Sequence, residues 1–113
     1  MNRCDVVDVD LPDIGHRPAV IVTRQVAIPF LVNVTVASIT TRTRGLPTEV
    51  QLDRAQGLDD ESVVNCDKLF TIPKSAIGRT RGELDPAQQH QLDAALTIAL
   101  GLDPLRAVGR TGK

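Results

Sequence analysis

Apolar and acidic residues alternate near the start of the chain with the two-residue period of a β-strand. The run from Val7 to Leu11 has the sequence Val-Asp-Val-Asp-Leu, and Pro12 closes it. Such alternation is typical of a strand with one buried and one exposed face. The pattern therefore predicts a half-buried strand over residues 7–11, followed by a turn around Gly15.

Further runs rich in β-branched residues predict most of a small sheet. They cover Arg17–Thr23, Leu31–Ile39, Thr48–Leu52, Ser62–Cys66, Leu69–Ile72 and Ile77–Arg81. The fourth and fifth runs are either two paired strands or one bent strand. Residues 24–29 and 53–61 are predicted to be loops, residues 45–47 a turn, and residues 73–76 a single helical turn.

A helix is predicted at the end of the strand region. Asp85 is a good N-cap residue and Pro86 suits the first helical position, while Gly101 suits the C-terminal cap. An apolar stripe is expected to pack on the sheet. It consists of Leu92, Ala95, Leu96, Ala99 and Leu100. The chain is therefore predicted to be mainly β with a C-terminal helix, and its bent antiparallel sheet to be closer to an SH3-like barrel than to a βαβ fold.

Length and composition favour one globular domain. The chain has 113 residues, of which 42% are hydrophobic and 24% charged. We expect residues 1–101 to form a single domain and residues 102–113 to be a flexible C-terminal tail. The net charge of −1 excludes a protein that coats nucleic acid by bulk electrostatics. The absence of Trp and Tyr excludes a platform of stacked aromatic rings.

The two cysteines and the acidic residues give no sign of a metal site. Cys4 and Cys66 belong to no CxxC pair, which indicates two reduced thiols in a cytoplasmic protein. Asp8 and Asp10 lack a third ligand at useful spacing. The N-terminus has no apolar segment typical of an export signal, and the most apolar run, residues 26–36, is too interrupted to span a membrane.

Two predicted strand ends carry the candidate chemistry. Arg17 stands at the start of one strand after the short loop Asp13–His16, and the polar, basic string Thr40–Gly45 follows another. Arginine offers planar forked donors and threonine a hydroxyl, which together suit a phosphodiester. In the alternative interpretation, Arg17 forms a surface ion pair with Asp13 or Asp8, and the threonines are solvated.

Four sequence blocks, in this order, resemble the MazF/PemK family of toxin mRNA interferases. They are Asp5–Pro12, Arg17–Val22, Val36–Thr41 and Ser62–Asp67. The resemblance runs from about Asp5 to Leu100. It implies an SH3-like barrel, a homodimer, and sequence-selective cleavage of single-stranded RNA without metal or cofactor. It also implies inhibition of translation and growth, and neutralisation by a cognate antitoxin.

By position, the resemblance implies roles for individual residues. Arg17 matches the family's catalytic arginine and Thr40 its catalytic hydroxyl residue, while Asp67 and Lys68 fall where relatives line the RNA groove. The chain departs from the family pattern at Cys4, where glycine is usual. Its loop Asp13–His16 is also shorter than is common, which bears on the base preference of the site.

We expect metal-free cleavage to use the adjacent 2'-hydroxyl as nucleophile. Arg17 would stabilise charge on the phosphorane oxygens, and Thr40 would donate to the same phosphate. His16 is a candidate general base, because imidazole changes charge near neutral pH; the alternative is a surface histidine. Four further residues are candidates for RNA binding, or else belong to solvated strand ends and loops. They are Thr41, Arg42, Arg44 and Asn65.

Two binding functions compete with RNA cleavage. A toxin of the same barrel fold that poisons gyrase would grip its target with an aromatic C-terminus, but residues 107–113 contain no Trp. An adaptor for proline-rich peptides needs a groove lined by exposed aromatic residues. Phe30 and Phe70 are too few to build one. The enzyme is therefore the leading hypothesis.

Overall fold

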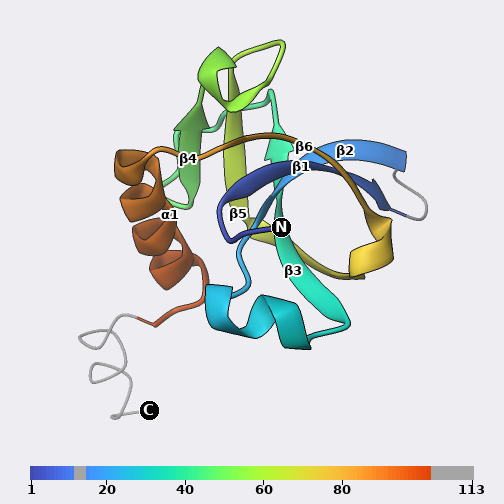
Figure 1. Cartoon of the computed structure of the whole chain (residues 1–113). Helices are drawn as coiled ribbons and strands as arrows, with labels where there is room; N and C mark the ends of the chain where they lie inside the picture. The colour runs from blue at the N-terminus through green and yellow to red at the C-terminus, as the bar shows by residue number, and fades with distance from the viewer. Residues whose placement is uncertain (12–14, 103–113) are drawn as a thin grey trace, which may run out of the picture.

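The computed structural model describes residues 1–11 and 15–102, which form one antiparallel sheet and a C-terminal helix (Figure 1). The strands are β1 (Asp5–Leu11), β2 (Gly15–Ile21), β3 (Asn33–Thr40), β4 (Glu49–Leu52), β5 (Ser62–Pro73) and β6 (Ile77–Glu83). The helices are α1 (Pro86–Ala99) and the short 3₁₀ turns η1 (Gln25–Phe30), η2 (Arg54–Gln56) and η3 (Lys74–Ala76). The strand order is β4-β5-β3-β2-β1-β6. The predicted fold class, a bent antiparallel sheet with a C-terminal helix, is confirmed.

Strand β5 resolves the alternative left open for residues 62–72, because it is one bent strand. Its partner β3 pairs Ala37 with Leu69 but the next residue, Ser38, with Asn65. Residues 66–68 therefore have no partner on β3 and form a bulge. A bulge of this kind bends a strand and redirects its side chains. Here it lies in the middle of the longest strand of the sheet.

The β1–β2 hairpin is longer than the sequence pattern predicts. Gly15 and His16 belong to β2, where they pair with Leu11 and Asp10, so their prediction as loop residues is wrong. Gly15 has a φ of 84°, in the left-handed region that favours glycine. Residues 12–14 lie outside the described residues. The pairing is possible because ladder hydrogen bonds satisfy the backbone of residues that carry no apolar pattern.

Two other segments differ from the predicted loops. Residues 25–30 form η1, which buries Ala27 and Ile28. Within the predicted loop 53–61, η2 begins with a capping box in which Asp53 and Gln56 satisfy each other's backbone amides. Short 3₁₀ turns of this kind carry little periodicity, and this explains why the sequence pattern missed them.

Hydrophobic side chains fill both faces of the sheet. Adjacent residues Val6 and Val7 are both fully buried, although a strand turns them to opposite faces. One core lies under α1 and includes Val6, Val20, Ala37, Val64, Leu84, Leu92 and Ala95. The other includes Val7, Val9, Ala19, Ile21, Ile28, Val36 and Ile72. The covered faces hold the strands rigidly where they approach the candidate site.

The terminal helix packs on the sheet largely as its apolar stripe predicts. Asp85 accepts a hydrogen bond from the Gln88 amide at 2.7 Å, and Pro86 occupies the first turn. Figure 1 shows α1 beside β4 and β5, away from the β1–β2 hairpin. Leu100, the last residue of the predicted stripe, is 55% exposed because the helix ends at Ala99.

Cys4 adopts a backbone conformation in the left-handed region that favours glycine. Its φ is 73°, yet its side chain is buried, and its backbone bonds both Ile21 and Leu84. The preceding Arg3 pairs with Asp93 of α1 at 2.9 Å, so this turn joins the helix to the sheet. Burial raises the pKa of the Cys4 thiol, and it raises that of Cys66 to about 11. Both thiols are free, buried and protonated at neutral pH.

The structure bears in part on two further predictions, the flexible C-terminal tail and the absence of a membrane-spanning segment. The predicted tail, apart from Leu102, lies outside the described residues. No helix within residues 1–11 and 15–102 is long and apolar enough to cross a membrane.

We predict that Gly57→Ala destabilises the fold by about 2–4 kcal/mol. Gly57 has a φ of 79°, and a Cβ atom there would clash with the backbone carbonyl of Arg81 in β6. The matched control is Gly45→Ala, whose φ is 68° and whose Cβ would meet nothing within 4 Å. It should cost only about 1 kcal/mol. Urea denaturation of both variants measures the difference, and equal losses would contradict the close contact between η2 and β6.

Candidate active site

A cavity of about 530 Å³ lies where β2 and β3 part. The two strands pair only from Ala19–Ser38 to Ile21–Val36, although each continues beyond this ladder. If the register continued two residues further, Arg17 would stand opposite Thr40 on the same face. Instead the strand ends open around the cavity. Its described lining residues are Arg17, Pro18, Ile39, Thr40, Thr41, Arg42, Ser62 and Lys68.

The Thr40 hydroxyl is held in an orientation that suits hydrogen-bond donation. The backbone N–H of Arg42 donates to Thr40 Oγ1 at 3.1 Å. A hydroxyl has one donor and two acceptor sites. Because an acceptor site is already occupied by the chain, the O–H remains available to a ligand in the cavity.

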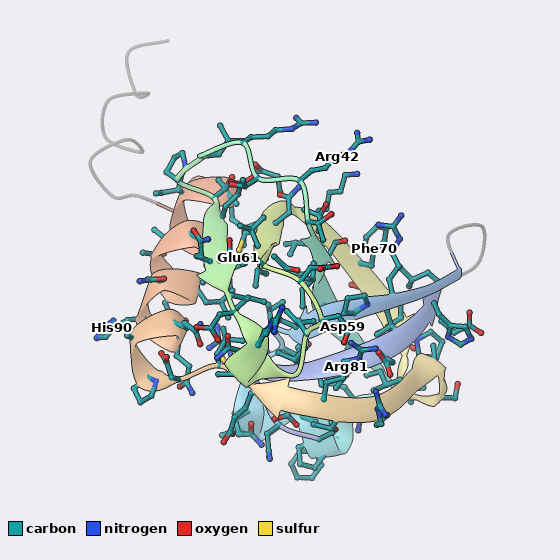
Figure 2. All side chains as sticks on the ribbon, turned by 90° about the horizontal axis from the view of Figure 1, so that it is seen from above. Arg42, Asp59, Glu61, Phe70, Arg81 and His90 are labelled. Atoms are coloured by element: carbon teal, nitrogen blue, oxygen red, sulfur yellow. The ribbon has the colours of Figure 1, made fainter. Side chains whose placement is uncertain are left out.

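The bulge in β5 brings a second cation to Arg17. Lys68, at the end of the bulge, lines the main cavity and also an adjoining cavity of about 250 Å³. Arg17 lines both cavities as well, and Phe70 forms part of the smaller one. Figure 2 shows the labelled Arg42 and Phe70 on the side away from α1, which carries the exposed His90. The bulge thus contributes Lys68 to the lining of both cavities.

The side chains around the cavity carry an excess of positive charge. Arg17, Arg42 and Lys68 line it, and no carboxylate does among the described residues. Asp8, a potential partner of Arg17, instead pairs with Arg81 at 2.7 Å and Arg79 at 3.8 Å. Asp13, the other potential partner, lies outside the described residues. Within the described chain Arg17 forms no ion pair.

Three residues predicted to bind RNA do not line this cavity. Asn65 Oδ1 accepts a hydrogen bond from the Asp67 amide at 3.0 Å, and Asp67 in turn accepts one from the Thr48 hydroxyl at 2.6 Å. These contacts hold the start of the bulge against the turn before β4. Arg44 lies further along the exposed loop that follows β3.

His16 lies apart from Arg17 and Thr40. Successive residues of a strand point to opposite faces, so His16 and Arg17 diverge. His16 lines a separate cavity of about 400 Å³ with Asp8, Asp10 and residues of β6. The structure therefore does not bring the proposed base to the proposed phosphate-binding groups.

The structure adds Glu49, which the sequence pattern did not single out. Its carboxylate accepts hydrogen bonds from the backbone amides of Arg44, Gly45 and Leu46 and from the Thr43 hydroxyl. Desolvation acts to raise the pKa of Glu49, but these hydrogen bonds outweigh it and hold the pKa below its ordinary value. The Glu49 side chain thus orders the backbone of the loop between β3 and β4, which carries Arg42 and Arg44 and is called the basic loop below. The partners lie only three to six residues before Glu49 in the chain, but the apolar pattern of the strands gives no sign of these contacts.

Ser62 is a second lining residue that the sequence reasoning missed. Its hydroxyl donates to the carbonyl of Asp60 at 3.0 Å, at the start of β5. Within the described residues no three His, Cys, Asp or Glu side chains are grouped as metal ligands would be. The polar lining of the cavity consists of cationic side chains and hydroxyls.

Residues 2–100 match the family described as PemK-like, MazF-like toxin of type II toxin–antitoxin systems. The chain belongs to this family. It is 49% identical over 87 residues to endoribonuclease MazF3 of Mycobacterium tuberculosis, covering 77% of this chain and 84% of the relative. It is 32% identical over 99 residues to the probable endoribonuclease MazF5 of the same species, covering 87% and 91%. The predicted family is confirmed.

Solved structures of family members share the fold. The Mycobacterium tuberculosis toxin MazF-mt6 aligns with a TM-score of 0.79 and 45% identity, covering 87% of this chain and 98% of that one. A mycobacterial endoribonuclease in complex with its cognate antitoxin aligns with a TM-score of 0.83 and 31% identity, covering 91% and 97%. This chain therefore contains nearly all of the sheet and helix seen in these solved structures.

We predict that Glu49→Gln lowers the thermal midpoint at neutral pH by about 2–5 °C. A neutral amide replaces the carboxylate, and its NH₂ group would face backbone donors. Because the folded-state pKa of Glu49 is depressed, its stabilisation is present above the unfolded value near 4.3 and is lost as pH falls through the folded value. The difference from wild type should therefore shrink below about pH 4.

The control for this variant is Glu83→Gln, which removes the same charge from an exposed position in β6. Thermal denaturation followed from pH 3 to pH 8 compares the two variants. A difference for Glu49→Gln that does not vary with pH would contradict the anchoring role of its charge.

Proposed function

We propose that the protein is a toxin that cuts single-stranded RNA selectively by sequence and so inhibits translation and growth. Family membership and relatives named as endoribonucleases support the reaction class. The observation that carries the proposal for this chain is the cavity in which Arg17 and Thr40 meet. A phosphodiester is the substrate group that best matches its cations and hydroxyls.

In the proposed reaction the ribose 2'-hydroxyl attacks the neighbouring phosphorus and displaces the 5'-oxygen. Negative charge then grows on the non-bridging oxygens of the phosphate. Arg17 donates two parallel hydrogen bonds to these oxygens and Thr40 Oγ1 donates a further one. Lys68 adds positive charge on the same side. Water accepts the proton that the 2'-hydroxyl loses and supplies the one that the leaving 5'-oxygen gains, so the products are a 2',3'-cyclic phosphate and a free 5'-hydroxyl.

Electrostatic stabilisation is the contribution that we assign to this cavity. No imidazole or carboxylate lines it among the described residues. Arginine remains protonated in proteins, so Arg17 acts as a donor and not as a base. The charge of these fixed side chains takes the place that a divalent cation would otherwise occupy, and we propose that cleavage is independent of metal.

We propose a homodimer that is neutralised by a cognate antitoxin in the cytoplasm. The similar mycobacterial endoribonuclease solved with its cognate antitoxin supports the second partner. For self-association, the support is a cluster of exposed apolar residues on η1 and just before β3. Val26, Phe30 and Val32 are 75%, 87% and 80% exposed. Burial of such side chains against a second copy would remove apolar surface from water.

Cleavage of a long single-stranded RNA in the presence of EDTA tests the proposed function. We predict discrete cuts whose ends are a cyclic phosphate and a 5'-hydroxyl, mapped by primer extension and end labelling. Arg17→Ala and Thr40→Val should each lower the rate about a hundredfold or more, since removal of one transition-state donor commonly costs about 3 kcal/mol.

The control is Arg54→Ala, which removes the same charge from the exposed surface of η2, outside the cavity. It should cleave within about twofold of wild type, because exposed charges away from a site contribute little. Intact RNA after incubation with the wild-type protein would refute the enzyme proposal. Full activity of Thr40→Val would remove its hydroxyl from the mechanism.

We predict that His16→Ala cleaves RNA within a few-fold of wild type and with an unchanged pH–rate profile. The reason is that His16 lines a cavity separate from Arg17 and Thr40. His90→Ala, an exposed change on α1, serves as the reference. A loss of about fifty-fold or more, together with loss of the limb due to imidazole ionisation, would restore His16 as the general base.

A further inference from the structure

A small polar cavity of about 90 Å³ adjoins the main cavity. The two share Thr41 and Ser62 as lining residues, so they lie next to each other. The remaining lining residues of the small cavity are Thr43, Gln51, Glu61 and Val63. It is too small for a whole nucleotide, but it can receive the edge of a base whose sugar and phosphate occupy the larger space.

The sheet register sets Gln51 at a defined distance from Thr40. Val63 of β5 pairs with Thr40 on one side and with Gln51 of β4 on the other. The three residues form one row across three strands and point to the same face. Two strand spacings separate Thr40 from Gln51, which is roughly 10 Å between backbones. This is comparable to the span from a phosphate to the far edge of its base.

Glu61 is the unexpected member of this cavity. It is exposed and forms no ion pair with the described residues. A carboxylate this close to a cationic cavity disfavours phosphate, so it does not serve backbone binding. The nearby Glu49 differs, since its carboxylate is occupied by the amides of the basic loop. Glu61 is thus an available acceptor at the border of the phosphate-binding cavity.

We propose that Glu61, together with Gln51, reads one base beside the scissile phosphate and selects a base that carries an exocyclic amino group. An ionised carboxylate only accepts hydrogen bonds, so it pairs with the amino group of cytosine and repels the O4 carbonyl of uracil. Gln51 both donates and accepts, and it can pair with a neighbouring ring atom of either base. This inference rests on the proposed RNA cleavage and adds a specificity-determining residue to it.

The test uses single-stranded RNA substrates that differ only by cytosine or uracil at one position near the mapped cut. We predict that the wild-type protein prefers cytosine at one such position by about tenfold or more. In Glu61→Gln the amide can donate as well as accept, so the preference should fall to within about twofold. A purely structural role for Glu61 would lower both rates together and leave their ratio unchanged.

Asp59→Asn is the matched control, since it removes the same charge from the same segment but not from the cavity lining (Asp59 and Glu61 are labelled in Figure 2). It should keep the wild-type ratio. If the wild-type protein cleaves but shows no cytosine preference at any position, or if Glu61→Gln retains it, the inference fails while the proposed function stands. If the wild-type protein cleaves neither substrate, both fail.

Discussion

The separation of β2 from β3 beyond the Ala19–Ser38 pair is the constraint on which the rest of the site depends. Paired strands would satisfy each other's backbone and close the space between them. Because they part, Arg17 and Thr40 face a cavity and not a ladder partner. The two strands can separate here because hydrophobic cores cover both faces of the sheet. These cores hold the strand ends in place without hydrogen bonds between β2 and β3.

The site also concentrates charge that the chain as a whole does not have. A net charge of −1 accompanies a cavity lined by Arg17, Arg42 and Lys68 and by no described carboxylate. Acidic residues are used elsewhere: Asp8 with the arginines of β6, and Glu49 with the backbone of the basic loop. This distribution concentrates positive charge at one place on a chain of small net charge.

The apolar pattern marks the strand ends at which Arg17 and Thr40 stand, and both residues line the cavity. The pattern gives no sign of where a residue's neighbours in space differ from its neighbours in the chain. His16 precedes Arg17 but lies on the other face of β2, while Asn65 and Asp67 hold the bulge and the turn before β4. No local motif distinguishes Glu49, which accepts hydrogen bonds from the loop after β3, or Glu61, which lines the small cavity, from a solvated carboxylate.

The amino-acid sequence by itself determined the strands, the capped helix and the family. Alternation of apolar and polar residues, helix-capping residues and the four family-like sequence blocks are all properties of short segments. Only the tertiary structure decided which side chains share a cavity. The bulge at residues 66–68 brings Lys68 to Arg17, and the row Thr40–Val63–Gln51 arises from pairing between segments far apart in the chain. Register is set by the packing of the whole sheet, and a shift of one residue would turn each of these side chains to the opposite face.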